Sequence, residues 1–254
     1  MKPIGIAITL TITLFLLSCG GAMIAEGGTG GTGVTTGTVQ GYGSLFVNDV
    51  EFDVSDAVFL RNGQPAPNGE QDYTVGEVVT IRGKVSDDGA TGIADEVIYE
   101  DLLKGRVTLA TTDYIQVLGQ DVMLDGKTVF IGFTNPESLA DRYVEVSGFR
   151  TADGAIRATN IKVQSQQQGE YEITGVISSV GNDNSFSIGG LTVEYTDFPG
   201  GAPEVGQVVE VRIESVISDD RVLAREIELV DREDYEEQTQ IELEGLITLF
   251  NAVT

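Results

Sequence analysis

Residues that commonly carry out catalysis are scarce in this sequence. Its 254 residues contain no histidine and one cysteine, Cys19. Without histidine there is no Ser-His-Asp or Cys-His nucleophile, no HExxH zinc site and no imidazole pH switch. A single cysteine can form neither an internal disulfide nor a thiolate metal cluster. We therefore expect no enzymatic activity, no catalytic residues, no cofactor and no dedicated metal site.

Three short segments resemble catalytic or phosphate-binding motifs but lack their context. Gly41–Leu45 is close to GxSxG but out of frame, and no base histidine exists. Asp125–Thr128 resembles the end of a P-loop, but Asp121 stands where the first glycine is needed. Gly28–Gly33 reads GxGxxG without the preceding strand and following helix that a dinucleotide site requires. These segments are interpreted as turns and linker. Pairs of carboxylates could in principle hydrolyse a glycosidic bond, but nothing in the sequence sets their separation.

Acidic residues recur at equivalent turns and could offer oxygen ligands to Ca²⁺. They are Asp87-Asp88, Asp153 and Asp219-Asp220, with Asn182-Asp183-Asn184 at another turn. Asp-Gly is also common hairpin-turn chemistry, and none of these turns has the D-x-D-x-D-G calcium loop. A turn role is favoured, and weak Ca²⁺ binding at these turns is the alternative.

The aromatic residues on the expected strands fit core packing, with stacking on a sugar or peptide as the alternative. They are Phe46, Phe52, Phe133, Phe186 and Tyr195.

The charge balance is strongly acidic. Lys plus Arg number 15 and Asp plus Glu number 40, which gives a formal net charge of −25. Such a surface repels nucleic-acid phosphates and anionic lipid headgroups. We expect no nucleic-acid partner. The acidity either favours basic partners or keeps the protein soluble.

The N-terminus is typical of an exported protein. Lys2 precedes the uncharged apolar stretch 4–17, which is shorter than the roughly 20 residues of a membrane-spanning helix. Leu16-Leu17-Ser18-Cys19 resembles a bacterial lipobox, which implies lipidation at Cys19 after removal of the signal peptide 1–18. Gly20 in place of aspartate implies the outer membrane of a Gram-negative bacterium. A cleaved signal ending beside a buried cysteine is the alternative. Residues 19–36, rich in Gly and Thr, are interpreted as a flexible tether.

After residue 36 the sequence repeats itself. Gly37, Gly105, Gly175 and Gly245 each open a unit and are followed by an aliphatic residue one or two positions later. Two further landmarks recur in fixed order: alternating segments at 75–85, 141–149 and 205–216, and closing segments at 93–100, 156–163 and 222–229. This order indicates tandem units. We assign repeat 1 to 37–102, repeat 2 to 103–168 and repeat 3 to 169–232.

Each repeat reads as about five short strands joined by polar turns. The predicted fold class is all-β: three tandem small five- to six-stranded OB-like barrels plus one leftover strand of a fourth unit. A two-sheet sandwich is the alternative. Hairpin turns are predicted at Asn48-Asp49, Gly119-Gln120 and Gly189-Gly190, and one short helical turn within 136–142.

The repeat pattern resembles a family of bacterial exported domains of unknown function, with the theme G-x-V, G-x-x-V-x-V-x-G and dG-x-x-x-A-x-x-V. The matching residues in the first unit are Gly37, Gly76, Val78, Gly83, Gly89, Ala94 and Val97, and in the second Gly105, Val144, Val146, Gly148, Gly154, Ala158 and Ile161. The third unit departs at Ile213 and Arg221. These strand-and-turn motifs imply a scaffold and no reaction.

The end of the sequence, 233–254, is interpreted as an acidic linker and the first strand of an incomplete repeat 4. Either the reading frame is truncated, which is favoured, or this strand completes a sheet in a neighbour or partner. We expect a lipid-anchored, non-enzymatic binding or scaffold module of the cell envelope with a protein partner there. A structural subunit of a surface assembly, joined through the C-terminal strand, is the alternative.

Overall fold

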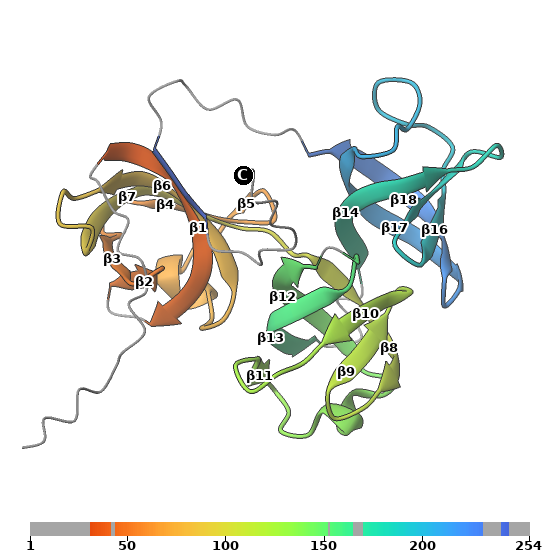
Figure 1. Ribbon diagram of the computed structural model, residues 1–254, viewed down its shortest axis with the longest axis horizontal. Coiled ribbons are helices and arrows are strands. Elements are labelled where there is room, and N and C mark those ends of the chain that lie inside the picture. Colours follow the sequence, from red (N-terminus) through yellow and green to blue (C-terminus); the bar gives the residue numbers. More distant parts are fainter. Residues whose placement is uncertain (1–30, 42–43, 152, 165–169, 231–239, 244–254) are drawn as a thin grey trace, which may run out of the picture.

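The computed structural model describes residues 31–41, 44–151, 153–164, 170–230 and 240–243. These residues form three small β-barrels arranged around a common centre, as Figure 1 shows. Among the described residues, helical structure is confined to two single 3₁₀ turns, η1 (Gly69–Asp72) and η2 (Pro136–Leu139). The all-β prediction is confirmed, and η2 lies where a helical turn was predicted.

Barrel 1 is closed by five strands in the order β1-β2-β3-β7-β6-β1. Within this order the neighbours β3 and β7 are parallel. The short strands β4 and β5 extend its sheet beside β7. The strands are β1 (Gly31–Gly41), β2 (Leu45–Val47), β3 (Val50–Asp53), β4 (Val58–Arg61), β5 (Gln64–Pro65), β6 (Val78–Val85) and β7 (Thr91–Tyr99).

Barrel 2 repeats this order as β8-β9-β10-β13-β12-β8, and β11 lies parallel to β13 beyond β10. Its strands are β8 (Leu103–Ala110), β9 (Tyr114–Val117), β10 (Gln120–Met123), β11 (Val129–Ile131), β12 (Tyr143–Arg150) and β13 (Ile156–Gln164).

Barrel 3 has the order β14-β15-β16-β18-β17-β14, in which the neighbours β16 and β18 are again parallel. Three copies of one strand order confirm the predicted tandem OB-like barrels. The strands are β14 (Tyr171–Val180), β15 (Ser185–Ile188), β16 (Leu191–Glu194), β17 (Val208–Ser218) and β18 (Arg221–Leu229).

Alternation along the strands builds the cores. In β3, Val50 and Phe52 are buried while Glu51 and Asp53 are exposed, as expected when successive side chains point to opposite faces. Barrel 1 has a core cluster of its own that includes Phe52, Tyr73 and Tyr99.

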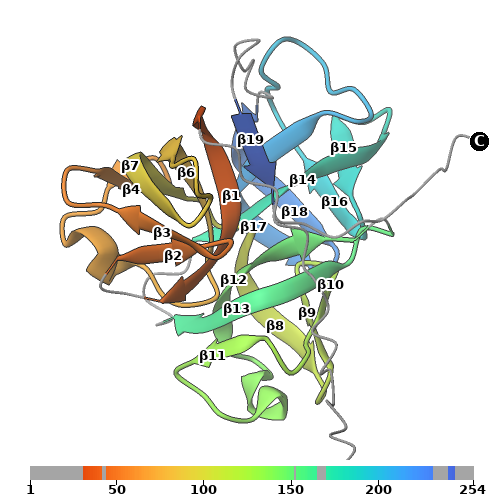
Figure 2. The ribbon, with the colours of Figure 1, turned by 60° about the vertical axis from the view of Figure 1, so that its left-hand side comes forward.

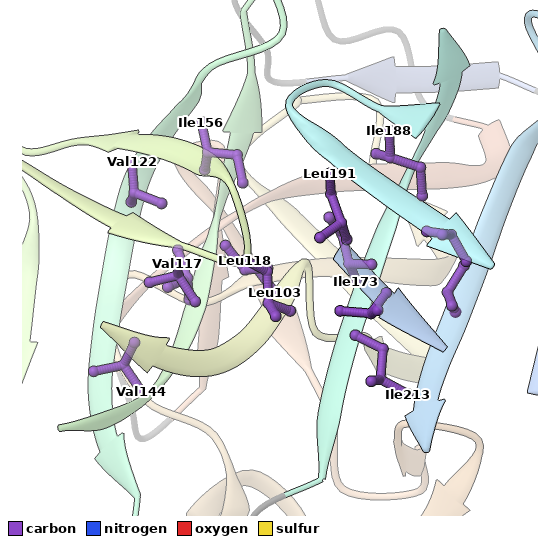
Figure 3. Packing of buried hydrophobic residues seen from close by; sticks show 14 of the residues in the cluster. Leu103, Val117, Leu118, Val122, Val144, Ile156, Ile173, Ile188, Leu191 and Ile213 are labelled. Carbon is purple, nitrogen blue, oxygen red and sulfur yellow. The ribbon is translucent and has the colours of Figure 1, made fainter. Parts of the chain in front are cut away.

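Barrels 2 and 3 share one continuous core cluster. Their first strands pair antiparallel, with Leu103 opposite Ile173 and Lys104 opposite Glu172. Figure 3 shows Leu103 and Leu118 on the side of the barrel 2 core that faces Ile173 and Leu191 of barrel 3. These two barrels are therefore joined through backbone pairing and apolar packing.

The second hairpin turn lies one residue earlier than predicted. Strand β9 ends at Val117 and β10 begins at Gln120, so Leu118 and Gly119 form the turn, with φ of 49° and 65°. A two-residue type I′ turn needs positive φ at both positions, and leucine rarely adopts it. The Leu118 side chain is buried in the core, and this apolar packing accounts for a leucine at a turn position with positive φ.

Glycine in the V-x-V-x-G pattern marks a β-bulge. A Cβ on Gly83 would lie 2.1 Å from the Ile93 carbonyl oxygen, and one on Gly148 would lie 2.2 Å from that of Arg157. The register shifts at both positions. Ile213 stands at this place in barrel 3, where several register shifts between Arg212 and Ser218 accommodate a side chain.

The predicted tether boundary is wrong at its C-terminal end. Residues 31–36 were assigned to the tether 19–36, but they belong to β1 and pair antiparallel with β6, from Gly31 opposite Val85 onward. The Gly- and Thr-rich composition suggested a linker, whereas pairing with β6 satisfies the backbone hydrogen bonds of this segment. Gly31 therefore already belongs to barrel 1.

Strand β19 (Gln240–Leu243) pairs in parallel with β1, from Gly33 opposite Gln240 to Thr36 opposite Leu243. Figures 1 and 2 both show it beside β1 of the first barrel. The C-terminal strand thus extends a sheet of its own chain. Within the described part of the chain, no helix has the length and apolar character needed to cross a membrane.

Candidate functional site

The three barrels meet around a polar cleft of about 520 Å³. Four cationic and four anionic side chains line it, so its charged lining has no formal net charge. This balance contrasts with the net charge of −25 of the whole chain. The charged lining residues are Arg61 and Asp72 of barrel 1, Lys104 of barrel 2, and Glu170, Glu172, Arg212, Arg225 and Glu226 around barrel 3.

Arg61, at the end of β4, connects barrel 1 to barrel 2. Its Nη1 and Nη2 donate to Glu77 Oε2 and Oε1 at 3.1 and 2.8 Å, and Nη2 also contacts Glu145 Oε1 of barrel 2. Its guanidinium carbon lies 3.9 Å from the centre of the Tyr99 ring. Burial alone would lower the pKa of Arg61, but the hydrogen bond to Glu77 and the charge of Glu145 outweigh it and raise the pKa. The guanidinium therefore remains charged.

The carboxylate of Glu145 is almost fully enclosed at this junction, with 5% of the residue exposed. It accepts a hydrogen bond from the Tyr99 hydroxyl at 2.9 Å and another from Gln164 Nε2. Burial, and next the negative charge of Glu145, raise the pKa of Tyr99 well above its usual value, so the hydroxyl remains a donor. With Arg61, these contacts satisfy a charge that would otherwise be costly to bury.

Asp101, in the connection between barrels 1 and 2, is held from both sides. Its Oδ2 accepts from Asn62 Nδ2 at 2.5 Å, and its backbone N–H donates to Asn62 Oδ1 at 3.0 Å. The same carboxylate contacts Lys104 Nζ, which lies 3.3 Å from Glu172 Oε2 of barrel 3. Lys104 thereby links the barrel 1–2 connection to barrel 3.

Arg150 is a half-buried cation held by neutral groups between barrels 2 and 3. It donates to the Thr174 carbonyl oxygen at 2.7 Å and to Gln120 Oε1 at 3.0 Å. Burial lowers the pKa of Arg150 to about 10. Gln120 Nε2 in turn donates to the Ile188 carbonyl oxygen at 2.9 Å, which adds a second tie across the junction.

Glu210 and Glu172 lie together on neighbouring strands of barrel 3, beside Arg212. Burial raises the pKa of Glu210 to about 8, and its hydrogen bond to Glu172 adds to the shift. Arg212 Nη2 donates to Glu210 at 2.7 Å, and its Nε lies 3.9 Å from Glu172. A protonated carboxyl at neutral pH is a feature of some catalytic acids. Here burial and the neighbouring Glu172 carboxylate account for it.

The buried acidic residues of the described part share one role. Each contacts either Arg61 or Lys104, and thereby the region where the barrels join. They are Glu77, Asp101, Glu145 and Glu172.

The acidic turns singled out from the sequence lie apart on separate hairpins and act as turn caps. Asp88 Oδ1 accepts the backbone N–H groups of Ala90 and Thr91, which lowers the pKa of Asp88. Asp153 accepts from the Thr151 hydroxyl, which lowers its pKa as well. No group of three potential metal-ligating side chains gathers within the described ranges. The turn interpretation is supported for these carboxylates.

Two further acidic turn residues, Asp183 and Asp220, behave in the same way. Asp183 Oδ1 accepts from the Ser185 hydroxyl at 2.6 Å, and Asp220 Oδ1 from the Ser218 hydroxyl at 2.7 Å.

Most of the aromatic residues singled out from the sequence belong to the cores. Phe52 and Phe186 are each 1% exposed. Phe133 and Tyr195 are half-buried against the shared core of barrels 2 and 3, and Phe46 is half-buried on β2. Core packing is thus confirmed for Phe52 and Phe186.

The segment Asp125–Thr128, which resembles the end of a P-loop in the sequence, forms the turn between β10 and β11. There the Asp125 carboxylate accepts hydrogen bonds from the backbone N–H of Lys127 and from the Arg157 side chain. Cys19, the signal peptide 1–18, residues 19–30 of the tether, and 233–239 and 244–254 of the C-terminal region lie outside the described residues.

Sequence reasoning missed the junction residues. Glu145 sits in an alternating Val-Glu-Val segment, which predicts an exposed glutamate, yet residues 143–147 are all buried. The outer face of β12 is covered because another barrel packs on it. Arg61 and Glu145 are 84 residues apart, and no local pattern reports a contact between two barrels.

Two segments of the chain, 104–162 and 174–228, match a family described as a domain of unknown function, DUF5666. These segments correspond to barrels 2 and 3, so the chain carries tandem matches to this domain. No match to a curated protein was found.

Proposed function

We propose that this chain is an exported lipoprotein, lipidated at Cys19 and anchored to the cell envelope, whose barrels form a non-enzymatic binding or scaffold module. The observation that carries the scaffold role is the use of the buried carboxylates. Glu77, Asp101, Glu145 and Glu172 each contact Arg61 or Lys104 in the region where the barrels join. A catalytic acid would face a substrate site, whereas of these four residues only Glu172 lines the polar cleft. The buried charge supports a fixed arrangement of barrels.

The anchoring part of this proposal rests on the sequence around Cys19. An apolar stretch followed directly by the single cysteine of the chain fits lipid attachment, and more than one acyl chain gives stable anchoring. The strongly acidic body would be repelled by anionic headgroups, so attachment depends on the lipid. We place the protein at the outer membrane of a Gram-negative bacterium, with a protein partner in the envelope.

Metabolic labelling with an alkyne fatty acid tests the anchor. The full chain expressed in a Gram-negative host should incorporate the label and sediment with outer-membrane vesicles. Cys19→Ser should lose both properties. Label retained in Cys19→Ser, or an unlabelled wild-type chain, would refute lipidation at this residue.

The binding role is tested with the anchored chain by cross-linking and capture from envelope extract. A defined partner should be recovered with the wild-type chain. Glu145→Gln, which weakens the junction between barrels 1 and 2, should recover less of it. Arg82→Gln changes a surface ion pair of barrel 1, outside the junction, and is the matched control. Equal recovery with both variants would argue against a role for the barrel arrangement.

A second candidate is a structural subunit joined through its C-terminal strand. The parallel pairing of β19 with Gly33–Thr36 favours it, because the same pairing could form between two copies. Removal of residues 241–254 should then shift the oligomeric state measured by native mass spectrometry. An unchanged oligomeric state would exclude this candidate.

A further inference from the structure

A second pocket, of about 410 Å³, lies between barrels 1 and 2. Its lining combines an apolar part with a polar rim, which is the usual make-up of small-molecule sites. The apolar part includes Val129 and Phe149, and the rim includes Asp125, Lys127 and Arg157.

The base of this pocket is a close contact between the two barrels. Gly76, with φ of 88°, lies so near barrel 2 that a Cβ there would be 2.6 Å from the Thr159 carbonyl oxygen and 2.9 Å from Val129 Cγ2. Asn160 Nδ2 donates to the Val75 carbonyl oxygen at 2.8 Å beside it. The pocket is therefore closed on one side by direct packing.

The charges on the rim leave one cation available. Arg157 donates through Nε and Nη2 to Asp125 Oδ2 at 2.9 and 2.6 Å, so the Asp125 charge is engaged. Lys127 is exposed, and its ammonium group has no ion-pair partner in the part of the chain that the structure describes. The rim thus has a formal charge of +1 in a chain of net charge −25. That balance favours a ligand with one negative charge.

Phe149 gives the apolar part its character. The residue is half-buried, lines the pocket and lies outside the two core clusters of the described residues. None of the aromatic ring pairs among the described residues includes Phe149. An aromatic ring of a ligand could stack on it in an offset or edge-to-face arrangement, the geometries that aromatic pairs prefer.

We propose that this pocket binds a small aryl carboxylate, with the ring against Phe149 and the carboxylate at Lys127. This inference deepens the binding role proposed above and depends on it. It does not depend on lipidation at Cys19.

The test titrates the full chain, purified in mild detergent, with 3-phenylpropionate and with its neutral analogue 3-phenylpropionamide, by isothermal titration calorimetry against detergent alone. The acid should bind more tightly than the amide. Lys127→Gln should weaken binding of the acid about fivefold, as expected for a charge pair near the surface, and leave the amide unchanged. Lys84→Gln, an exposed lysine of β6 outside the pocket lining, is the matched control.

Phe149→Leu should weaken binding of both compounds, and its folding is checked by circular dichroism. Because Lys127 is exposed, its variant keeps the test valid if Phe149→Leu does not fold. Absence of binding at millimolar concentration, equal affinity for acid and amide, or equal effects of Lys127→Gln and Lys84→Gln would each overturn the proposal. A failure here would leave fatty-acid labelling at Cys19 unaffected, so the two results are distinguishable.

Discussion

Removal of the Arg61 side-chain charge should loosen barrel 1 from barrel 2. Arg61→Met keeps much of the aliphatic stem but leaves Glu77 and Glu145 without their cation, and these side chains are 1% and 6% exposed. Loss of one partner from a buried ion pair costs about 3–5 kcal/mol. Glu77 keeps a hydrogen bond from Thr74 N–H, and Glu145 keeps that from Tyr99, so we expect the lower end, about 3 kcal/mol.

Hydrogen exchange of the peptide spanning β6 and β7 measures this loss in barrel 1 separately. A loss of about 3 kcal/mol corresponds to more than a hundredfold faster exchange through opening of that barrel. Arg82→Met is the matched control, because the Arg82–Glu96 pair has side chains 42% and 33% exposed, and surface pairs contribute about 0–1 kcal/mol. Urea is the denaturant of choice for a parallel equilibrium measurement, since guanidinium would screen the charges.

A double-mutant cycle separates the charge pair from general damage. Glu145→Gln removes the buried charge that Arg61 neutralises, so the combined variant should be less destabilised than the sum of the single variants. If Arg61→Met accelerates exchange no more than Arg82→Met, or if the two changes are additive, the junction is held by other contacts and our reasoning is wrong.

Further expectations concern pH, packing and calcium. The folded-state pKa of Glu210 is raised from 4.5 to about 8, so its contribution to stability is present below about pH 4.5 and is lost as pH rises to about 8. Glu210→Gln should flatten this decline of the melting temperature with pH. An unchanged pH profile would contradict the shift. Gly76→Ala should lower the free energy of unfolding in urea by about 2 kcal/mol or more, because Gly76 combines a positive φ with a close contact to Thr159. Gly206→Ala, where φ is 95° and the space is open, should lower it by only about 1 kcal/mol. Equal losses would show that the clash at Gly76 relaxes. Added Ca²⁺ should leave the melting temperature unchanged, and a rise abolished by Asp88→Asn would instead support calcium at the acidic turns.

The sequence predicted the barrels well because their construction is local. Alternation along 50–53 places Val50 and Phe52 inside, and Asn48-Asp49 adopts the positive φ values of a tight hairpin. The repeated landmarks became the last two strands of each barrel. The start of β1 was missed because GTGVTT has the composition of a linker, and its partner β6 lies more than 40 residues away.

The junctions could not be predicted from the sequence because they depend on how whole barrels are placed. Whether Glu145 faces water or Arg61 is decided by the packing of barrel 1 on β12, and the Val-Glu-Val pattern is the same in both cases. Phe149 lies in an alternating strand like the core aromatics, yet it lines a pocket that exists only where two barrels meet. Functional sites of this chain are therefore to be sought between repeats.

The edges of the first strands explain how the copies associate. In barrels 2 and 3 the residues just before the repeat glycines, Leu103–Lys104 and Glu172–Ile173, pair with each other. The equivalent segment of barrel 1, Gly33–Thr36, pairs with Gln240–Leu243, which precedes the fourth repeat glycine in the same way. An open strand edge presents unpaired backbone groups, and each of these pairings covers one. The segment before the repeat glycine therefore has a common role in the three barrels and in β19: it is where one part of the chain adds to the sheet of another.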